Sequence, residues 1–206
     1  VKVCSGDLWL DRSLARFLMI RRPPRSTLFP YTTLIRSQNA ILPAGLYHQL
    51  GIVAQEQRQW AQAEKYYQQA LGITIEFNDR YGQSTTLHTL GSVALGKGEL
   101  EQAKQYYHQA LEIYIEFNDW YLQAMAYHQL GRVAEEQGQW AQAREYFLQA
   151  LAIGVEYNDT YRIESRTQSL ARLWQASQDD AIPAAVAGVL KISEAEAREL
   201  LQKALE

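Results

Sequence analysis

Apolar residues recur at steps of three and four along most of the chain, which is the spacing of one face of an α-helix. In one segment these positions are Leu87, Leu90 and Ala94, and in the next they are Ala103, Tyr107, Ala110, Leu111 and Tyr114. Gly96, Lys97 and Gly98 interrupt the pattern between the two segments. The pattern therefore predicts amphipathic helices that occur in pairs and are joined by short turns.

The same pair returns every 40 residues. The string YHQLG begins at Tyr47 and at Tyr127, and LHTLG begins midway between them at Leu87. A second string starts as WAQAEKYYQQAL at Trp60, LEQAKQYYHQAL at Leu100 and WAQAREYFLQAL at Trp140. A fixed spacing of this kind indicates one helix pair that is repeated and stacked on its own copies.

An Asn-Asp dipeptide separates successive pairs, at residues 78–79, 118–119 and 158–159. Asn tolerates the left-handed conformation that ends a helix, and Asp is a favoured N-cap for the helix that follows. Each dipeptide is therefore expected to end one helix and begin the next. The turns within the pairs are expected near residues 57–59, 97–99 and 137–139.

Gly51, Gly91 and Gly131 lie inside the first helix of each pair. A glycine there costs about 1 kcal/mol relative to alanine, so its recurrence indicates close approach of another helix. The large residues of the second helices are expected to fill the space between repeats; they are Trp60, Leu100, Trp140, Tyr67, Tyr107 and Phe147.

These residues carry a family resemblance. The first helix of each pair carries an aromatic residue or Leu, then Leu-Gly and then Ala, and the second helix carries Ala, then Tyr or Phe, and then Ala-Leu. This order resembles the tetratricopeptide repeat (TPR) over residues 44–163. The unit of 40 residues is longer than the usual 34, and Asn-Asp replaces the proline that often closes it, so the chain looks like a long-helix variant. The resemblance implies an all-α fold, a right-handed α-solenoid of antiparallel helix pairs.

The expected organisation follows from this register. Three repeats are expected at residues 38–83, 84–123 and 124–163, then a capping helix at 164–180 and a C-terminal helical segment at 181–206. Within that last segment Pro183 can open a helix, and Ser193 with Glu196 has the spacing of a capping box. A helix-turn-helix DNA reader is the alternative there, but the acidic balance of its second helix disfavours it.

The beginning of the chain is of a different kind. Residues 19–37, MIRRPPRSTLFPYTTLIRS, are similar to the translation of a common sequencing adapter and depart from it only at Ile35. Residues 1–37 are therefore expected to be non-native and disordered, with the natural protein starting near Gln38 and its own N-terminus missing. The alternative is a natural basic tail that targets the protein or binds an anionic surface.

Composition narrows the function. The single cysteine, Cys4, excludes an internal disulfide or a cysteine metal cluster. Residues 38–206 carry thirteen basic and twenty-one acidic side chains, a net charge of −8 that argues against a nucleic-acid partner. The sequence contains no HExxH, phosphate-binding loop or GxSxG motif and no long apolar span. We therefore expect a cytoplasmic protein that is not an enzyme, uses no cofactor and has no membrane partner.

The resemblance to TPR proteins implies a concave groove, lined by first helices, that holds an extended peptide or a partner helix. The positions that match the family's groove are His48, Gln49, Ile52, Gln55, His88, Thr89, Ser92, His128, Gln129, Arg132, Glu135, Gln168 and Arg172. Arg132 and Arg172 could hold a carboxylate in the planar geometry of the guanidinium group.

His48, His88 and His128 occupy one repeat position and are expected to form a column along this groove. Such a column could be a metal site, a pH-dependent surface or a set of peptide contacts, or could simply reflect duplication of the repeat. Neighbouring helices lie about 8 to 10 Å apart, whereas zinc needs His nitrogens at about 2 Å, which disfavours metal binding.

Two functions remain open after these exclusions. The first is an interaction scaffold that binds a protein or peptide through the groove. The second is a ligand-sensing arm of a larger signalling NTPase or transcriptional regulator whose N-terminal part is missing. Exposed repeat ends also leave self-association open.

Overall fold

The computed structural model describes residues 29–206, with side chains described from Pro43 onward, and no strand occurs in this part of the chain. The helices are α2 (Phe29–Glu56), α3 (Trp60–Glu76), α4 (Arg80–Lys97), α5 (Leu100–Glu116), α6 (Trp120–Glu136), α7 (Trp140–Glu156), α8 (Thr160–Ser177), α9 (Ala181–Leu190) and α10 (Glu194–Lys203). The expected disorder of residues 1–28 lies outside the described residues, whereas residues 29–37 are helical as the start of α2.

The Asn-Asp turns have the backbone conformation that the sequence predicted. Asn78, Asn118 and Asn158 adopt left-handed φ values of 56°, 52° and 53°. The following aspartates accept a hydrogen bond from the backbone N–H three residues on, over 2.9 Å for Asp79, 3.0 Å for Asp119 and 3.1 Å for Asp159. Each dipeptide therefore stops one helix and caps the next, and this prediction is confirmed.

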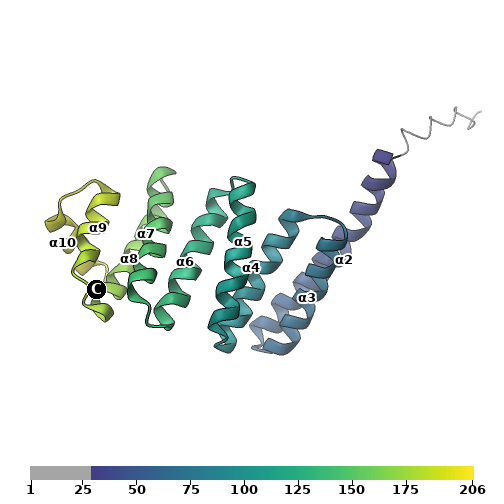
Figure 1. Ribbon diagram of the computed structural model, residues 1–206, viewed down its shortest axis with the longest axis horizontal. Helices are drawn as coiled ribbons and strands as arrows, with labels where there is room; N and C mark the ends of the chain where they lie inside the picture. Colours follow the sequence, from purple (N-terminus) through teal and green to yellow (C-terminus); the bar gives the residue numbers. More distant parts are fainter. Residues whose placement is uncertain (1–28) are drawn as a thin grey trace, which may run out of the picture. The chain divides into compact units, whose positions relative to one another are not determined.

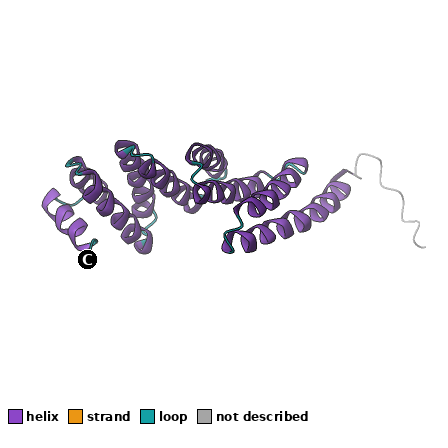
Figure 2. Ribbon diagram, turned by 90° about the horizontal axis from the view of Figure 1, so that it is seen from below, coloured by secondary structure: helices purple, strands orange, loops and turns teal. Residues whose placement is uncertain are grey.

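Residues 40–206 form one compact unit in which consecutive helices pack against each other. Contacts join α4 to α5 and α6 to α7 within pairs, and α3 to α4, α5 to α6 and α7 to α8 between pairs. Figure 1 shows these pairs following one another in a row, and Figure 2 shows that only short loops connect them. The unit is an all-α solenoid of helix pairs, as the sequence predicted.

The close approach expected at the repeated glycines is also observed. A methyl group added to Gly91 would lie 2.8 to 3.0 Å from three ring carbons of Tyr107. Gly51 and Gly131 meet Tyr67 and Phe147 in the same way. All three rings are completely buried. In each pair, the aromatic side chain of the second helix therefore packs directly against the glycine backbone of the first helix.

One expectation about the core is wrong. Trp140 is 39% exposed, although its counterpart Trp60 packs against the next pair, within about 3 Å of where a Cβ on Gly96 would lie. The position that corresponds to Gly96 eighty residues later is Ala176. Its methyl group would occupy the space that the Trp60 ring uses, so Trp140 cannot pack in the same manner.

The array ends in a cap. Helix α8 repeats the pattern of a first helix, and α9 and α10 take the place of its second helix. Ile182 and Leu201 are fully buried in one cluster with Leu170 and Leu173 of α8. The predicted capping box between Ser193 and Glu196 is present at the start of α10. The face of α8 that would otherwise pack against a second helix is therefore covered by α9 and α10.

The contact between Gly91 and Tyr107 predicts the effect of Gly91→Leu. The larger side chain has to displace a fully buried ring, so we expect the free energy of unfolding to fall by about 1 to 3 kcal/mol. Urea denaturation followed by circular dichroism measures this change.

Gly72→Leu is the matched control, because Gly72 is also helical and nothing lies within 4 Å of a Cβ built there. This variant is expected to be as stable as the parent chain or more so, since glycine is a poor helix former. Equal stability of the two variants would contradict the close approach at Gly91.

Candidate binding groove

All of the predicted groove positions lie on first helices and keep some solvent exposure. Consecutive first helices meet directly. The Tyr81 hydroxyl of α4 donates to the carboxylate of Asp119, the N-cap of α6, over 2.9 Å. His128 Nε2 of α6 lies 3.1 Å from the Ser169 hydroxyl of α8. The predicted positions therefore belong to a succession of adjoining helices.

Two of these positions have a structural partner in the second helix. The Tyr67 hydroxyl donates to Gln55 Oε1 over 3.0 Å, and the Ser92 hydroxyl lies 3.1 Å from the Tyr107 hydroxyl. Buried hydroxyl groups need such partners. The corresponding residue in the third pair is Phe147, which has no hydroxyl group, so the first helix there is free to carry other side chains.

The three histidine rings of the predicted column pack against the second helices and are not fully exposed. The rings of His48, His88 and His128 lie 5.3, 5.2 and 5.4 Å from the aromatic ring of their own second helix. Burial lowers the pKa of His88 to about 4. It is also the main cause that lowers the pKa of His128 to about 3, with nearby arginines adding to it. The rings are therefore neutral at pH 7.

Arg132 and Arg172 are exposed, and their hydrogen bonds are to neutral groups on their own helices. Arg132 donates to Gln129 Oε1 over 3.2 Å, and Arg172 donates to the Ser169 hydroxyl over 3.3 Å. Within the described residues neither forms an ion pair with a carboxylate. Most of their donors are thus available to a ligand.

A third arginine, Arg166 of α8, was missed by the sequence reasoning. Its side chain is only 8% exposed, its Nε atom has no hydrogen-bond partner, and it forms no ion pair with any described carboxylate. Its charge adds to those of Arg132 and Arg172 in lowering the pKa of His128. The signal was available, because Thr86 and Ala126 stand at this position in the preceding repeats. We call Arg132, Arg166 and Arg172 the arginine cluster.

Glu135 lies near Arg132 and Arg172 and interacts with their charges, but it forms no ion pair with either. Burial raises the pKa of its carboxyl group, and the charges of Arg172 and Arg132 act in the opposite direction. Thr89 donates its hydroxyl to the carbonyl oxygen of Thr86 on its own helix over 2.8 Å. Gln168 lies elsewhere, in a depression of about 430 Å³ that Tyr161 and Lys203 also line.

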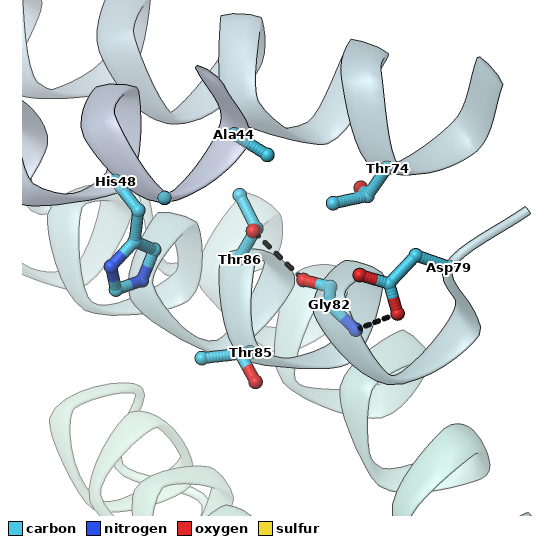
Figure 3. A pocket seen from close by; sticks show the side chains of 8 residues that line it. Ala44, His48, Thr74, Asp79, Gly82, Thr85 and Thr86 are labelled. Atoms are coloured by element: carbon cyan, nitrogen blue, oxygen red, sulfur yellow. Dashed lines mark hydrogen bonds between the residues drawn. The ribbon is translucent and has the colours of Figure 1, made fainter. Parts of the chain in front are cut away.

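A smaller pocket of about 200 Å³ adjoins the groove between α2 and α4, as Figure 3 shows. Its lining residues are Ala44, Gly45, His48, Thr74, Asp79, Gly82, Thr85 and Thr86. His48 stands at one side of the view and the Asp79 carboxylate at the other, with the backbone of Gly82 between Asp79 and the pair Thr85 and Thr86. His48 Nε2 is buried and has no hydrogen-bond partner. Of these residues only His48 was a predicted site residue.

Within residues 29–206, no group of three or more described His, Cys, Asp or Glu side chains could hold a metal ion. No described helix is long and apolar enough to cross a membrane.

Comparison with known families gives one match. The sequence model of the tetratricopeptide repeat matches residues 42–116 and again residues 83–154, which together cover more than half of the chain. A comparison with curated protein sequences finds no significant match.

Comparison with solved structures agrees in fold. BtubC from P. vanneervenii has a TM-score of 0.65 at 18% identity, over 93% of this chain and 70% of BtubC. The apo form of RapI has a TM-score of 0.64 at 16% identity, over 93% of this chain and 61% of RapI. A P. anserina protein, described as a kinesin light chain with TPR-like repeats, has a TM-score of 0.57 at 19% identity, over 79% of this chain and 94% of that one. At these identities the likeness concerns the fold, and the chain spans only part of BtubC and RapI.

The buried histidines predict a dependence of stability on pH. Burial lowers the pKa of His88 in the folded chain, so the unfolded chain binds its proton first, near the ordinary value of 6.5. The stability is complete above that pH and falls as the pH decreases toward 4. Protonation of His88 in the unfolded chain lowers the free energy of unfolding by about 1.4 kcal/mol per pH unit in this window.

Urea denaturation at pH 7, 6, 5 and 4 measures this dependence, with His88→Gln as the comparison. The variant lacks one titrating ring and is expected to show a shallower decline, because the carboxylates titrate equally in both chains. The same decline in the two chains would mean that His88 is solvated in the folded state.

Proposed function

The chain belongs to the tetratricopeptide repeat family, and from this premise we propose that it binds a protein or peptide segment in the groove lined by its first helices. Helical repeat proteins of this family generally act as interaction scaffolds without catalysis. The alternative, a sensor arm of a larger regulator, would use the same surface.

The observation that carries the proposal is the arginine cluster. A buried guanidinium group is costly to desolvate and is normally paired with a carboxylate. Here Arg166 is buried and forms no ion pair, although the charge of Asp159 acts on it. The other two arginines of the cluster, whose charges act on His128 as that of Arg166 does, form no ion pair either among the described residues. The rest of residues 38–206 is acidic, so the cluster is a local excess of positive charge, and the nearby Glu135 and Asp159 form no ion pair with it.

A carboxylate of a bound segment would supply the missing partner. Arginine offers five N–H donors in a planar arrangement that matches two carboxylate oxygens. His128 beside the cluster stays neutral, and its Nε2 is already engaged with Ser169. We therefore infer that the ligand carries a carboxylate, from Asp, Glu or its own C-terminus, at the part of the groove between α6 and α8.

The test uses peptides selected from a random display library on the immobilised chain and then synthesised. Arg132→Ala combined with Arg172→Ala is expected to weaken binding by about tenfold to a hundredfold, since charge-assisted hydrogen bonds are lost. Isothermal titration calorimetry measures the change, and amidation of the peptide's carboxylates is expected to weaken binding to the parent chain similarly.

The matched control is Arg80→Ala combined with Arg198→Ala. These arginines are also exposed, but they pair with Glu116 and Glu194 and belong to no predicted groove position. This variant is expected to bind like the parent chain. If it loses affinity as much as the groove variant does, or if neither loses any, the groove assignment is wrong.

A further inference from the structure

The pocket between α2 and α4 exists because two positions of α4 carry small side chains. Gly82 has no side chain, and Thr86 turns its hydroxyl back to the carbonyl oxygen of Gly82 over 2.9 Å (Figure 3). One carboxylate oxygen of Asp79 accepts the Gly82 N–H. Its second oxygen has no hydrogen bond among the described residues, and a Cβ on Gly82 would lie 2.3 Å from it. The carboxylate thus lies directly over the missing side chain.

The repeat shows what fills this position elsewhere. Leu122 and Arg162 correspond to Gly82, at steps of 40 residues. Leu122 packs against the central core cluster. Arg162 instead forms an ion pair with Asp159, the counterpart of Asp79, and its guanidinium carbon lies 3.8 Å from the ring centre of Tyr121. The fold therefore already accommodates a guanidinium group beside the N-cap aspartate of a first helix.

We propose that the pocket between α2 and α4 receives an arginine side chain of the bound segment, with Asp79 as its counter-ion. The inference rests on the proposed function, since His48 lines both the pocket and the groove. The methyl groups of Ala44, Thr74 and Thr85 cover the aliphatic part of the side chain. The guanidinium group donates to the free oxygen of Asp79, as Arg162 does to Asp159.

His48 is suited to the same ligand. Burial lowers the pKa of His48, so its ring is neutral at pH 7 and does not repel a cation. In the tautomer that is protonated at Nδ1, the buried Nε2 atom is an acceptor that lacks a donor in the chain. His48 and Asp79 lie at opposite sides of the pocket (Figure 3), so the guanidinium group binds at Asp79 and the neutral His48 ring closes the other side without repelling it.

The two sites together give the ligand a direction. The pocket lies between α2 and α4, and the arginine cluster lies on α6 and α8, two first helices further on. Helix spacings of about 8 to 10 Å give a lateral separation of about 16 to 20 Å. Asp79 caps the start of α4, whereas Arg132 and Arg172 lie near the ends of α6 and α8, so the full separation is larger. An extended chain advances about 3.3 Å per residue, so the arginine and the carboxylate of the ligand are at least about five or six residues apart.

The test uses N-acetyl-arginine amide as the probe, so that no peptide ligand needs to be known. It is titrated into the full chain while the ¹⁵N–¹H resonance of Gly82 is followed by NMR. A saturable shift is expected for this probe and not for N-acetyl-citrulline amide, which has the same shape without the charge. Equal shifts with both probes, or none with either, overturn the proposal.

Asp79→Asn removes the charge while keeping the cap, because Asn is as good an N-cap as Asp. It is expected to weaken probe binding about tenfold or more. Asp119→Asn makes the same change where Leu122 stands in place of Gly82, and it is expected to leave binding unaltered. Asp79→Asn should melt at the temperature of the parent chain. Asp119→Asn also loses an acceptor for the Tyr81 hydroxyl, so circular dichroism at the NMR temperature verifies that it is folded. If Asp79→Asn binds the probe as well as Asp119→Asn does, Asp79 is not the counter-ion and the proposal fails.

The outcome is independent of the proposed groove function. The probe carries no carboxylate, so its binding does not involve the arginine cluster. Loss of peptide binding in the Arg132 and Arg172 variant, with no binding of the probe, would reject the pocket alone. The reverse result would reject the groove assignment and leave an isolated guanidinium site.

Discussion

The contact of one aromatic ring with bare backbone sets the geometry of every repeat. Tyr67, Tyr107 and Phe147 lie against Gly51, Gly91 and Gly131, where even a methyl group would come within 3.0 Å of ring carbons. The two helices of a pair can approach only because the glycine has no side chain. The buried ring then forms the inner wall on which the histidine of the first helix rests. The predicted groove positions thus rest on the packing of the core.

The same contact decides which side chains of the groove are available. In the first two pairs the buried tyrosine hydroxyl engages Gln55 or Ser92. In the third pair Phe147 has no hydroxyl group that needs a hydrogen-bond partner, and the position that corresponds to Ser92 is Arg132. Chemistry suited to a ligand therefore appears where the repeat departs from its own consensus. Arg166 in place of Thr86 or Ala126, and Gly82 in place of Leu122 or Arg162, follow the same rule.

These departures give the groove two unlike ends. The arginine cluster between α6 and α8 holds positive charge without carboxylate partners among the described residues, within an acidic array. The pocket between α2 and α4 holds a carboxylate with one free oxygen and an unpaired imidazole nitrogen. A surface that is basic at one end and acidic at the other distinguishes the two directions of an extended ligand, because the reversed segment would meet like charges.

The sequence by itself determined the repeat, the turns and the family. Apolar spacing and Asn-Asp are local signals, since helix periodicity and capping are properties of short segments. The glycines were informative because they recur with the repeat inside a helix, where glycine is otherwise unfavourable. It also predicted which first-helix positions line a binding groove. Only the tertiary structure decided that the histidines are half-buried, that Trp140 is exposed, that Arg166 lacks a carboxylate partner and that a pocket lies above Gly82. Burial and ion pairing depend on two helices at once. They are decided by whether a side chain of the neighbouring repeat, forty residues away, fills a space or leaves it open.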